Sequence, residues 1–460
     1  MAFICDEMTY KTFCEECHSV FLTPNNWKKV LKEWKPDFLF CESAWLGIQE
    51  CKGCWRGKIY KNQTLKFDNR KTLLQILKFC QKNQIKTVFW NKEDPTYFGN
   101  QQYDFVSTAL LFDYIFTTCQ ECISEYKRLG HPKVFLLQFA ANPLIYNPIH
   151  STKKRNQAVF AGSWYGENKE RCKEMRRIFD MVLHLGIELV IFDRNYGTTS
   201  FQKQFPEKYQ PYVRPAVPFE QLGDIIKQSQ YAININTVTE SSTMFARRVF
   251  ELILCNTVII SNPSAGMAAE FPNGIVFTDH SISISELEEA QKWKEKNICL
   301  VLKKHLNHNR FYQLCKETGF LRSLSEFPKI AVFYQNEAHA KHQLIRITYP
   351  HVDAYIQNSQ SCFSIIHEDN TPIIKHEEKI FQPSSYNYFY FCSPQTTEIP
   401  AIEELLYHFS YIAHINAFAG IKKGVLKYEF LKTDSYFETL WNISQWEKIE
   451  KNKDFLIYSI

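Results

Sequence analysis

The stretch that decides the fold is YAININTVTESSTMFARRVFELILCNTVIIS, residues 231–261. Residues 232–236 and 257–260 are mostly apolar and have the composition of buried β-strands. Between them, apolar residues recur at spacings of three and four: Phe245, Val249, Leu252 and Ile253. This spacing predicts a helix that begins near Thr243 and ends at Asn256 in the left-handed conformation. The whole stretch therefore predicts a strand–helix–strand unit of a parallel sheet.

A polar stripe runs beside the apolar face of this helix and consists of Thr243, Arg247, Arg248 and Glu251. Ser241 and Ser242 precede the helix and suit an N-cap, so free backbone N–H groups are expected near the two arginines. That combination predicts a site for phosphate or diphosphate, with Glu251 accepting hydrogen bonds from sugar hydroxyls. The alternative is a plain salt bridge between Arg247 and Glu251, four residues apart.

The rest of the chain extends this pattern into three domains. A length of 460 residues exceeds a single typical core. Strand-like and helix-like segments alternate over residues 1–152 and again over 153–325, with the polar linker NPIHSTKKRNQ between the two series. The fold class is therefore α/β, with two Rossmann-like domains whose ligands lie at the carboxyl ends of the strands. Residues 326–460 carry shorter strands and predict a C-terminal α+β domain.

Composition excludes several classes of protein. A net charge of +5 is mild and does not indicate nucleic acid as a partner, although it is compatible with an anionic substrate or peripheral membrane contact. No stretch approaches twenty uninterrupted apolar residues, so no transmembrane segment is expected. The first residues, MAFICDEMTYK, lack the features of a secretory signal. We expect a cytoplasmic protein.

Fifteen cysteines are expected to be free thiols in a reducing cytoplasm. Three pairs have C-x-x-C spacing: Cys14 with Cys17, Cys51 with Cys54, and Cys119 with Cys122. A zinc site that joins the first two pairs is the alternative.

Residues 238–261 resemble the donor-site segment of the CgeB-like glycosyltransferases, a family of two-domain GT-B type. Other segments resemble that family in the same order: PDFLFCESAW (36–45), VFWNKEDPTYF (88–98), FDYIFTT (112–118), QFAANPLIYNPI (138–149) and FAGSWY (160–165). The resemblance covers about residues 1–300. It implies a nucleotide-diphosphate sugar as donor, bound mainly by the second domain, with no metal and no cofactor.

The resemblance also implies roles for single residues. Glu251 matches the glutamate that holds the donor ribose, and Arg247 and Arg248 match a pair that neutralises the diphosphate. Related retaining enzymes have a second glutamate where this chain has Thr243, so retention or inversion of the anomeric centre stays open. The donor-binding residues expected on these grounds are Gly162, Ser163, Ser242, Thr243, Arg247, Arg248 and Glu251. For Gly162 and Ser163 a plain turn is the alternative.

The acceptor is expected at the first domain. Glu93 and Asp94 follow the strand at residues 87–90, at the edge of the sheet that faces the cleft. Either carboxylate is a candidate catalytic base for an acceptor hydroxyl, and an Asx-Pro turn is the alternative. Similar edges carry Asp6, and Glu42 with Ser43.

The C-terminal domain has a fainter resemblance. KYEFLKTDSYFETLWN (427–442) resembles the tail of GT-A-like domains, which usually hold a divalent cation with an Asp-x-Asp motif. Only Glu368 and Asp369 offer a comparable pair, so we expect a degenerate, non-catalytic domain.

The leading hypothesis is a glycosyltransferase that moves a sugar from a nucleotide-diphosphate sugar to a surface polysaccharide or glycoprotein. A non-catalytic protein that binds a sugar or nucleotide in the same cleft is the alternative. A dinucleotide oxidoreductase is a weaker one, because no G-x-G-x-x-G motif follows the first strand of either domain.

Overall fold

The computed structural model describes residues 1–320, 328–344, 349, 351–357, 361–368, 371–393, 402–416, 419–424, 427–433, 435, 438–446 and 455–460. The chain forms two compact units. Unit 1 comprises Met1–Asn142 and Arg155–Arg322, and unit 2 comprises Pro143–Lys154 and Ser323–Ile460.

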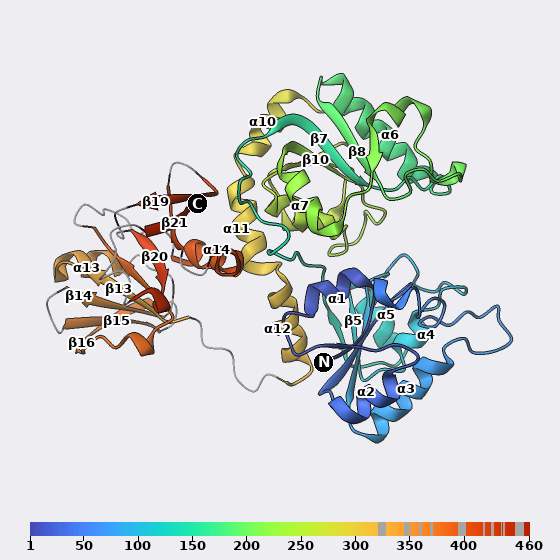
Figure 1. The fold of residues 1–460 in the computed structure, drawn as a ribbon, viewed down its shortest axis with the longest axis horizontal. Coiled ribbons are helices and arrows are strands. Elements are labelled where there is room, and N and C mark those ends of the chain that lie inside the picture. Colours follow the sequence, from blue (N-terminus) through green and yellow to red (C-terminus); the bar gives the residue numbers. More distant parts are fainter. Residues whose placement is uncertain are drawn as a thin grey trace. The chain divides into compact units, whose positions relative to one another are not determined.

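Unit 1 begins with a six-stranded parallel sheet of order β2-β1-β3-β4-β5-β6. Its strands are β1 (Ala2–Ile4), β2 (Val20–Phe21), β3 (Phe38–Glu42), β4 (Lys86–Asn91), β5 (Tyr114–Thr117) and β6 (Val134–Leu136). The helices of this domain are α1 (Glu7–Phe13), α2 (Trp27–Trp34), α3 (Lys71–Lys82), α4 (Val106–Ala109) and α5 (Gln120–Arg128), and they lie on both sides of the strands (Figure 1). Every residue of β3 is buried, as expected for a strand covered on both faces.

A second six-stranded parallel sheet has the order β12-β11-β10-β7-β8-β9. Its strands are β7 (Arg155–Gly162), β8 (Glu188–Asp193), β9 (Val213–Pro215), β10 (Ser229–Asn234), β11 (Val258–Ser261) and β12 (Ile275–Phe277). Its helices are α6 (Lys169–His184), α7 (Phe219–Lys227), α8 (Arg248–Leu254), α9 (Ala265–Glu270), α10 (Ile284–Gln291) and α11 (Lys294–Lys304). The strand order reverses between β7 and β10, which is where such sheets bind ligands. Two Rossmann-like domains are thus confirmed.

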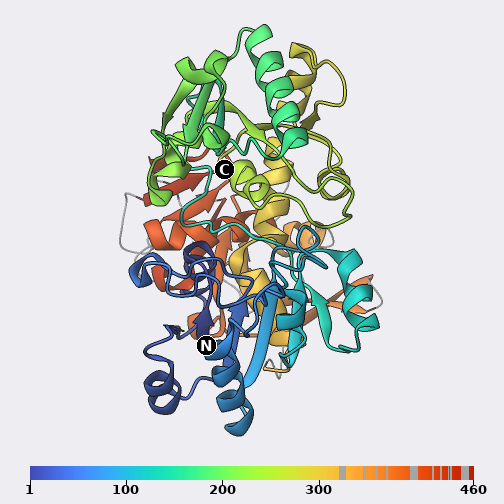
Figure 2. The same cartoon turned by 90° about the vertical axis from the view of Figure 1, so that its right-hand side faces the viewer.

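The last helix of unit 1, α12 (Asn307–Glu317), packs against the first sheet rather than the second (Figure 2). Leu314 is fully buried in the core of the first domain, and Phe311 and Phe320 pack against that core. The Gln313 amide donates a hydrogen bond of 2.7 Å to the carbonyl of Leu136 in β6. The chain therefore returns to the first domain after completing the second.

Unit 2 contains a mixed sheet of order β16-β15-β14-β13-β17-β20-β18-β21-β19. Its strands are β13 (Ile330–Tyr334), β14 (Val352–Ile356), β15 (Ser361–Glu368), β16 (Thr371–Glu378), β17 (Tyr388–Phe391), β18 (Gly420–Lys422), β19 (Glu429–Thr433), β20 (Thr439–Asn442) and β21 (Phe455–Ser459), and its helices are α13 (Glu337–Leu344) and α14 (Ile402–Ile415). Among the described strands of this third sheet, only β13 with β14, β13 with β17, and β18 with β21 pair in parallel. The predicted α+β class of the C-terminal domain is confirmed.

Glu368 ends β15, and Asp369 lies outside the described residues. Within the part of the chain that the structure describes, no helix is long and apolar enough to cross a membrane.

Candidate active site

A cavity of about 370 Å³ in unit 1 joins side chains of both Rossmann-like domains. It is lined by Asp6, Met8, Thr9, Thr12, Trp90, Lys92, Glu93, Phe139, Ala140, Ala246, Arg247 and Arg248. Asp6 follows β1, and Lys92 and Glu93 follow β4, so the first sheet contributes the carboxyl ends of its strands. The second domain contributes the segment that leads into α8. The predicted cleft residues Glu93, Arg247 and Arg248 therefore share one space.

The helix that carries the arginines starts later than the sequence predicts. The apolar spacing predicts a start at Thr243, whereas α8 begins at Arg248, with Arg247 in the cap position. Backbone N–H groups that were expected to face a phosphate are already bonded: Met244 donates to Ser241 Oγ at 3.0 Å, and Ala246 to Asn236 Oδ1 at 2.9 Å. The other end is as predicted, because Asn256 has φ 58°.

The segment before α8 is held by the first domain. Glu121 accepts hydrogen bonds from Ser241 Oγ (2.8 Å) and from Ser242 N (2.8 Å) and Oγ (2.7 Å). Thr243 Oγ1 donates to the carbonyl of Thr118 at 3.0 Å. Although burial alone raises the pKa of Glu121, hydrogen bonds from Cys119, Ser242 and Ser241 lower it to about 2. Ser242 and Thr243, expected at the donor, thus join the two domains in this structure and do not line the cavity.

Arg247 and Glu251 form the ion pair that their spacing allows, with 3.0 Å between Arg247 Nε and Glu251 Oε1. The Glu251 side chain is only 3% exposed, while that of Arg247 is 22% exposed. Among the described residues, no hydrogen-bond donor reaches the buried Oε2 of Glu251. A buried carboxylate oxygen without a donor is costly. Glu251, expected at the donor, does not line the cavity.

The candidate carboxylates of the first domain differ in their surroundings. Asp6 Oδ1 accepts N–H hydrogen bonds from Leu46 and Gly47 at 2.8 Å each, and Lys92 Nζ lies 3.1 Å from Asp6 Oδ2. Burial raises the pKa of Asp6, but Lys92 and the backbone donors outweigh this and lower it. Glu42 is fully buried, 3.1 Å from the same Lys92, and burial raises its pKa. Ser43 is also buried and binds the N–H of Lys92 at 3.0 Å.

Glu93 and Asp94 are neighbours in sequence but lie in different environments. Glu93 lines the cavity, and its Oε1 accepts a hydrogen bond of 2.9 Å from the Trp45 indole. Burial raises the pKa of Glu93, against the opposing effect of Lys92. Asp94 is fully buried away from the cavity lining and accepts hydrogen bonds from Thr117 (2.7 Å) and Tyr126 (3.1 Å). Burial raises the pKa of Asp94 to about 8. Of the two, only Glu93 lines the cavity.

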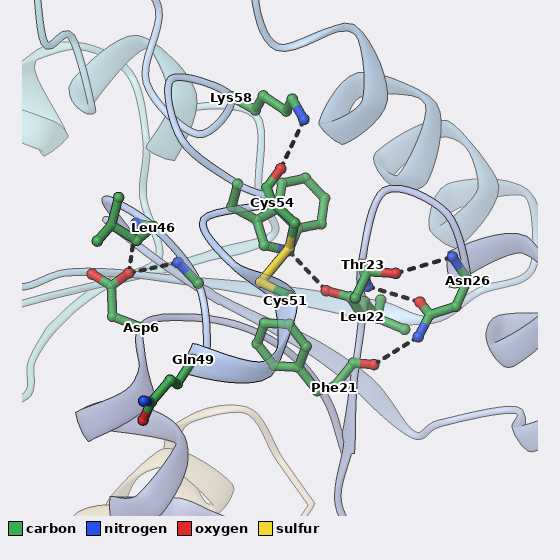
Figure 3. Close-up of a disulfide and its surroundings, with 12 residues drawn as sticks. Asp6, Phe21, Leu22, Thr23, Asn26, Leu46, Gln49, Cys51, Cys54 and Lys58 are labelled. Carbon is green, nitrogen blue, oxygen red and sulfur yellow. Dashed lines mark hydrogen bonds between the residues drawn. A yellow bond between two sulfur atoms is a disulfide. The ribbon is translucent and has the colours of Figure 1, made fainter.

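A disulfide supports the loop that holds Asp6 (Figure 3). Cys51 is the last residue of the 3-10 helix Gln49–Cys51, and the turn that follows brings its Cα atom within 5.3 Å of that of Cys54. The expectation of free thiols is therefore wrong for this pair, while none of the other thirteen cysteines forms a disulfide. A Cβ added to Gly47 would lie 2.8 Å from the Cys51 sulfur, so the disulfide packs directly on the residue whose N–H binds Asp6.

Gly162 and Ser163 lie at the end of β7 but do not line the cavity. A Cβ on Gly162 would lie 2.6 Å from the Phe160 ring, which gives the glycine a packing reason. Ser163 Oγ accepts a hydrogen bond of 3.3 Å from Arg194, and this arginine also bonds the Tyr165 hydroxyl at 3.1 Å. Arg171 in the first turn of α6 donates to the carbonyl of Ile235 at 2.9 Å. Arg171 and Arg194 add positive charge near the end of β7, where the strand order of the sheet reverses. The sequence pattern did not indicate them because they lie on separate elements.

No zinc or other metal site of three or more His, Cys, Asp or Glu side chains occurs among the described residues. The proposed zinc site between the first two C-x-x-C pairs is thus not formed, and one of those pairs is a disulfide.

Comparison with known proteins supports the class of the second domain. Residues 173–316 match the model of a protein family described as glycosyl transferase-like, which confirms the expected glycosyltransferase-like domain. The match covers less than half of the chain and does not extend to the CgeB-like subfamily. A search of curated proteins found no match.

Several solved structures are similar in fold. An alpha-glucosyltransferase in complex with UDP-glucose and DNA containing an abasic site has 10% identity and a TM-score of 0.45, covering 65% of this chain and 84% of that chain. HepE from Anabaena in complex with UDP-glucose has 11% identity and a TM-score of 0.45, with 68% and 89% covered. Sucrose-phosphate synthase from Thermosynechococcus elongatus has 11% identity and a TM-score of 0.42, with 65% and 77% covered. These likenesses are too low to identify the donor or acceptor of this chain.

Proposed function

We propose that this chain is a glycosyltransferase that moves a sugar from a nucleotide-diphosphate sugar to a hydroxyl group of a surface polysaccharide or glycoprotein. The observation that carries the proposal is the cavity itself, which presents Glu93 from one domain and Arg247 and Arg248 from the other. A carboxylate opposite two guanidinium groups suits a reaction in which a hydroxyl loses its proton while a diphosphate leaves.

In the proposed donor site, the ion pair between Arg247 and Glu251 stays in place when the donor binds. The Nε atom of Arg247 faces Glu251, while its Nη2 atom donates a hydrogen bond of 3.1 Å to Met8 Sδ at the cavity. A guanidinium has five N–H donors, so in this proposal the donors on Nη1 and Nη2 bind phosphate oxygens while Nε faces Glu251. Glu251 does not itself line the cavity, and in this proposal its buried Oε2 accepts a hydrogen bond from a ribose hydroxyl that enters beside Arg247. Arg248 adds a second positive charge at the cavity.

Glu93 is the best candidate for the base that activates the acceptor. Asp6 is a poor base because Lys92 and three backbone N–H groups lower its pKa. Glu42 and Asp94 do not line the cavity. Burial raises the pKa of Glu93, which strengthens it as a base, and the Trp45 indole fixes its orientation. Glu93 takes the hydroxyl proton, the acceptor oxygen bonds to the anomeric carbon, and the bond from that carbon to the diphosphate breaks.

A thermal-shift screen over UDP-, GDP-, CMP- and dTDP-sugars tests donor binding. A ligand at about a hundred times its Kd adds about 2.7 kcal/mol to the free energy of unfolding. Labelled donor then tests turnover, since an enzyme releases free sugar and nucleotide slowly even without acceptor. Glu93→Gln should bind donor like the parent and lose turnover, while Glu240→Gln, on an exposed loop, should retain both. Tight binding without any turnover by the parent would favour the non-catalytic alternative.

A further inference from the structure

A second and larger cavity, of about 800 Å³, lies within the second Rossmann-like domain. It opens at the carboxyl end of β8, the edge of a parallel sheet where ligands bind. None of its lining residues lines the cavity described above. The donor and acceptor of the proposed transfer therefore do not account for this second cavity.

The connection between β8 and β9 creates this space. Residues 194–212 contain only the short 3-10 helices η2 (Phe201–Lys203) and η3 (Glu207–Tyr212), where a longer helix would fill the surface of the sheet. The floor is well packed: the rings of Trp164 and Phe205 are 5.6 Å apart, and the Arg176 guanidinium lies 5.0 Å above Trp164. The cavity is thus formed by stable side chains before any ligand binds.

The polar lining consists mainly of hydrogen-bond acceptors. Asp193 ends β8 with its side chain largely buried, and one of its oxygens is held by the N–H of Asn195 at 2.9 Å. The amide nitrogens of Gln204 and Gln210 are used by the carbonyls of Thr198 and Phe205, which directs their side-chain oxygens to other donors. Such a lining suits a ligand with several hydroxyl groups.

The charges and aromatic side chains that line the second cavity indicate which class of ligand it can bind. Arg176 is the only cationic residue in the lining, and it is stacked on Trp164, so the cavity is poorly suited to phosphate groups. Two aromatic side chains of the lining are exposed, Phe201 at 88% and Tyr196 at 57%. Ligand sites commonly combine aromatic side chains with a small number of fixed polar groups.

We propose that this cavity is a saccharide-binding site, separate from the transfer site, which holds a neutral sugar of a glycan chain. The C–H face of the sugar ring lies on Phe201 or Tyr196, and its hydroxyl groups donate hydrogen bonds to Asp193 and to the glutamine oxygens. The proposal does not depend on transfer at the first cavity, because it requires only equilibrium binding of a neutral sugar.

The test uses the full chain with maltohexaose, cellohexaose and chitohexaose, by isothermal titration and ligand-observed saturation-transfer NMR. At least one hexasaccharide should bind. Phe201→Ala should weaken it by about three- to tenfold, since aromatic stacking of this size is lost. Asp193→Asn should weaken it by about tenfold, because charged hydrogen bonds are lost. Phe67→Ala is the matched control: this ring is 68% exposed but lies in the first domain, and its loss should change nothing.

Three outcomes would overturn the inference. The first is that no hexasaccharide binds the parent. The second is that Phe201→Ala and Asp193→Asn bind the sugar as tightly as Phe67→Ala does. The third is that uridine or guanosine competes for the site, which would make it a nucleoside site. Loss of glycosyl transfer with retained saccharide binding would concern only the proposed function.

Discussion

Arg247 has two roles in the proposed mechanism, and comparison of a single variant with a double variant that also changes Glu251 separates them. Arg247→Ala removes the partner of a carboxylate that is 3% exposed and leaves its charge buried. Breaking a buried ion pair costs about 3–5 kcal/mol, and we expect about 3 kcal/mol here because Arg247 is itself 22% exposed. Replacing Glu251 as well, in Arg247→Ala with Glu251→Gln, removes the stranded charge and should recover at least half of that loss.

Donor affinity should follow a different pattern. Loss of a charged hydrogen bond to phosphate costs about 1.5–3 kcal/mol, or about ten- to 150-fold in Kd. This loss should persist in the double variant, since nothing replaces the guanidinium at the cavity. Urea denaturation measures stability, and titration with the nucleotide diphosphate selected by the thermal screen measures affinity. A double variant that binds as tightly as the parent would refute the phosphate role and leave Arg247 as a structural residue.

Four further outcomes are expected. Activity should persist in excess EDTA, because arginines take the place of a cation at the diphosphate; loss of activity with recovery on adding Mn²⁺ would contradict this. The rate of the parent should rise with pH as Glu93 loses its proton, with a midpoint above 4.5, while the contribution of Glu93 to stability declines over the same interval. Denaturation of Glu93→Gln at several pH values should not show that decline, and the same decline in the variant would contradict the assignment. Glu121→Ala should lower the free energy of unfolding by about 1 kcal/mol near neutral pH. Because the pKa of Glu121 is lowered in the folded protein, this difference from the parent should vanish as pH falls from 4.5 toward about 2, which denaturation at several pH values would check. Reduction of Cys51–Cys54 should speed hydrogen exchange at Leu46 and Gly47, and a Cys14→Ser/Cys17→Ser variant should show the same response, because that pair is free.

The sequence predicted the features that depend on local pattern. Alternating strands and helices indicated the two parallel sheets, because period and length identify these elements without tertiary information. The same pattern correctly placed Glu93 and Arg247 at the cavity, because Glu93 follows a strand and Arg247 precedes a helix at the edge of a parallel sheet where ligands bind. The class of the second domain followed from the segment around α8 and agrees with the family match at residues 173–316.

The features that it could not predict depend on contacts between distant residues. The helix that was expected from Thr243 starts at Arg248 because Glu121, 120 residues earlier, binds Ser241 and Ser242. Asp94 looks like Glu93 in sequence, and only the positions of Thr117 and Tyr126 reveal that it is part of the core. The periodicity of the local sequence cannot show that Glu93, and not Asp94, faces the cavity.

The return of α12 to the first sheet affects how the chain is made. Leu314, Phe311 and Phe320 complete a core whose strands end at residue 136. During synthesis, the first domain cannot finish folding until the whole of the second has left the ribosome, which departs from the usual N-terminal-first order. Exposed apolar surface on the nascent first domain must persist through that interval. A nonsense mutation anywhere in the second domain removes α12 as well and should therefore leave the first domain incompletely folded.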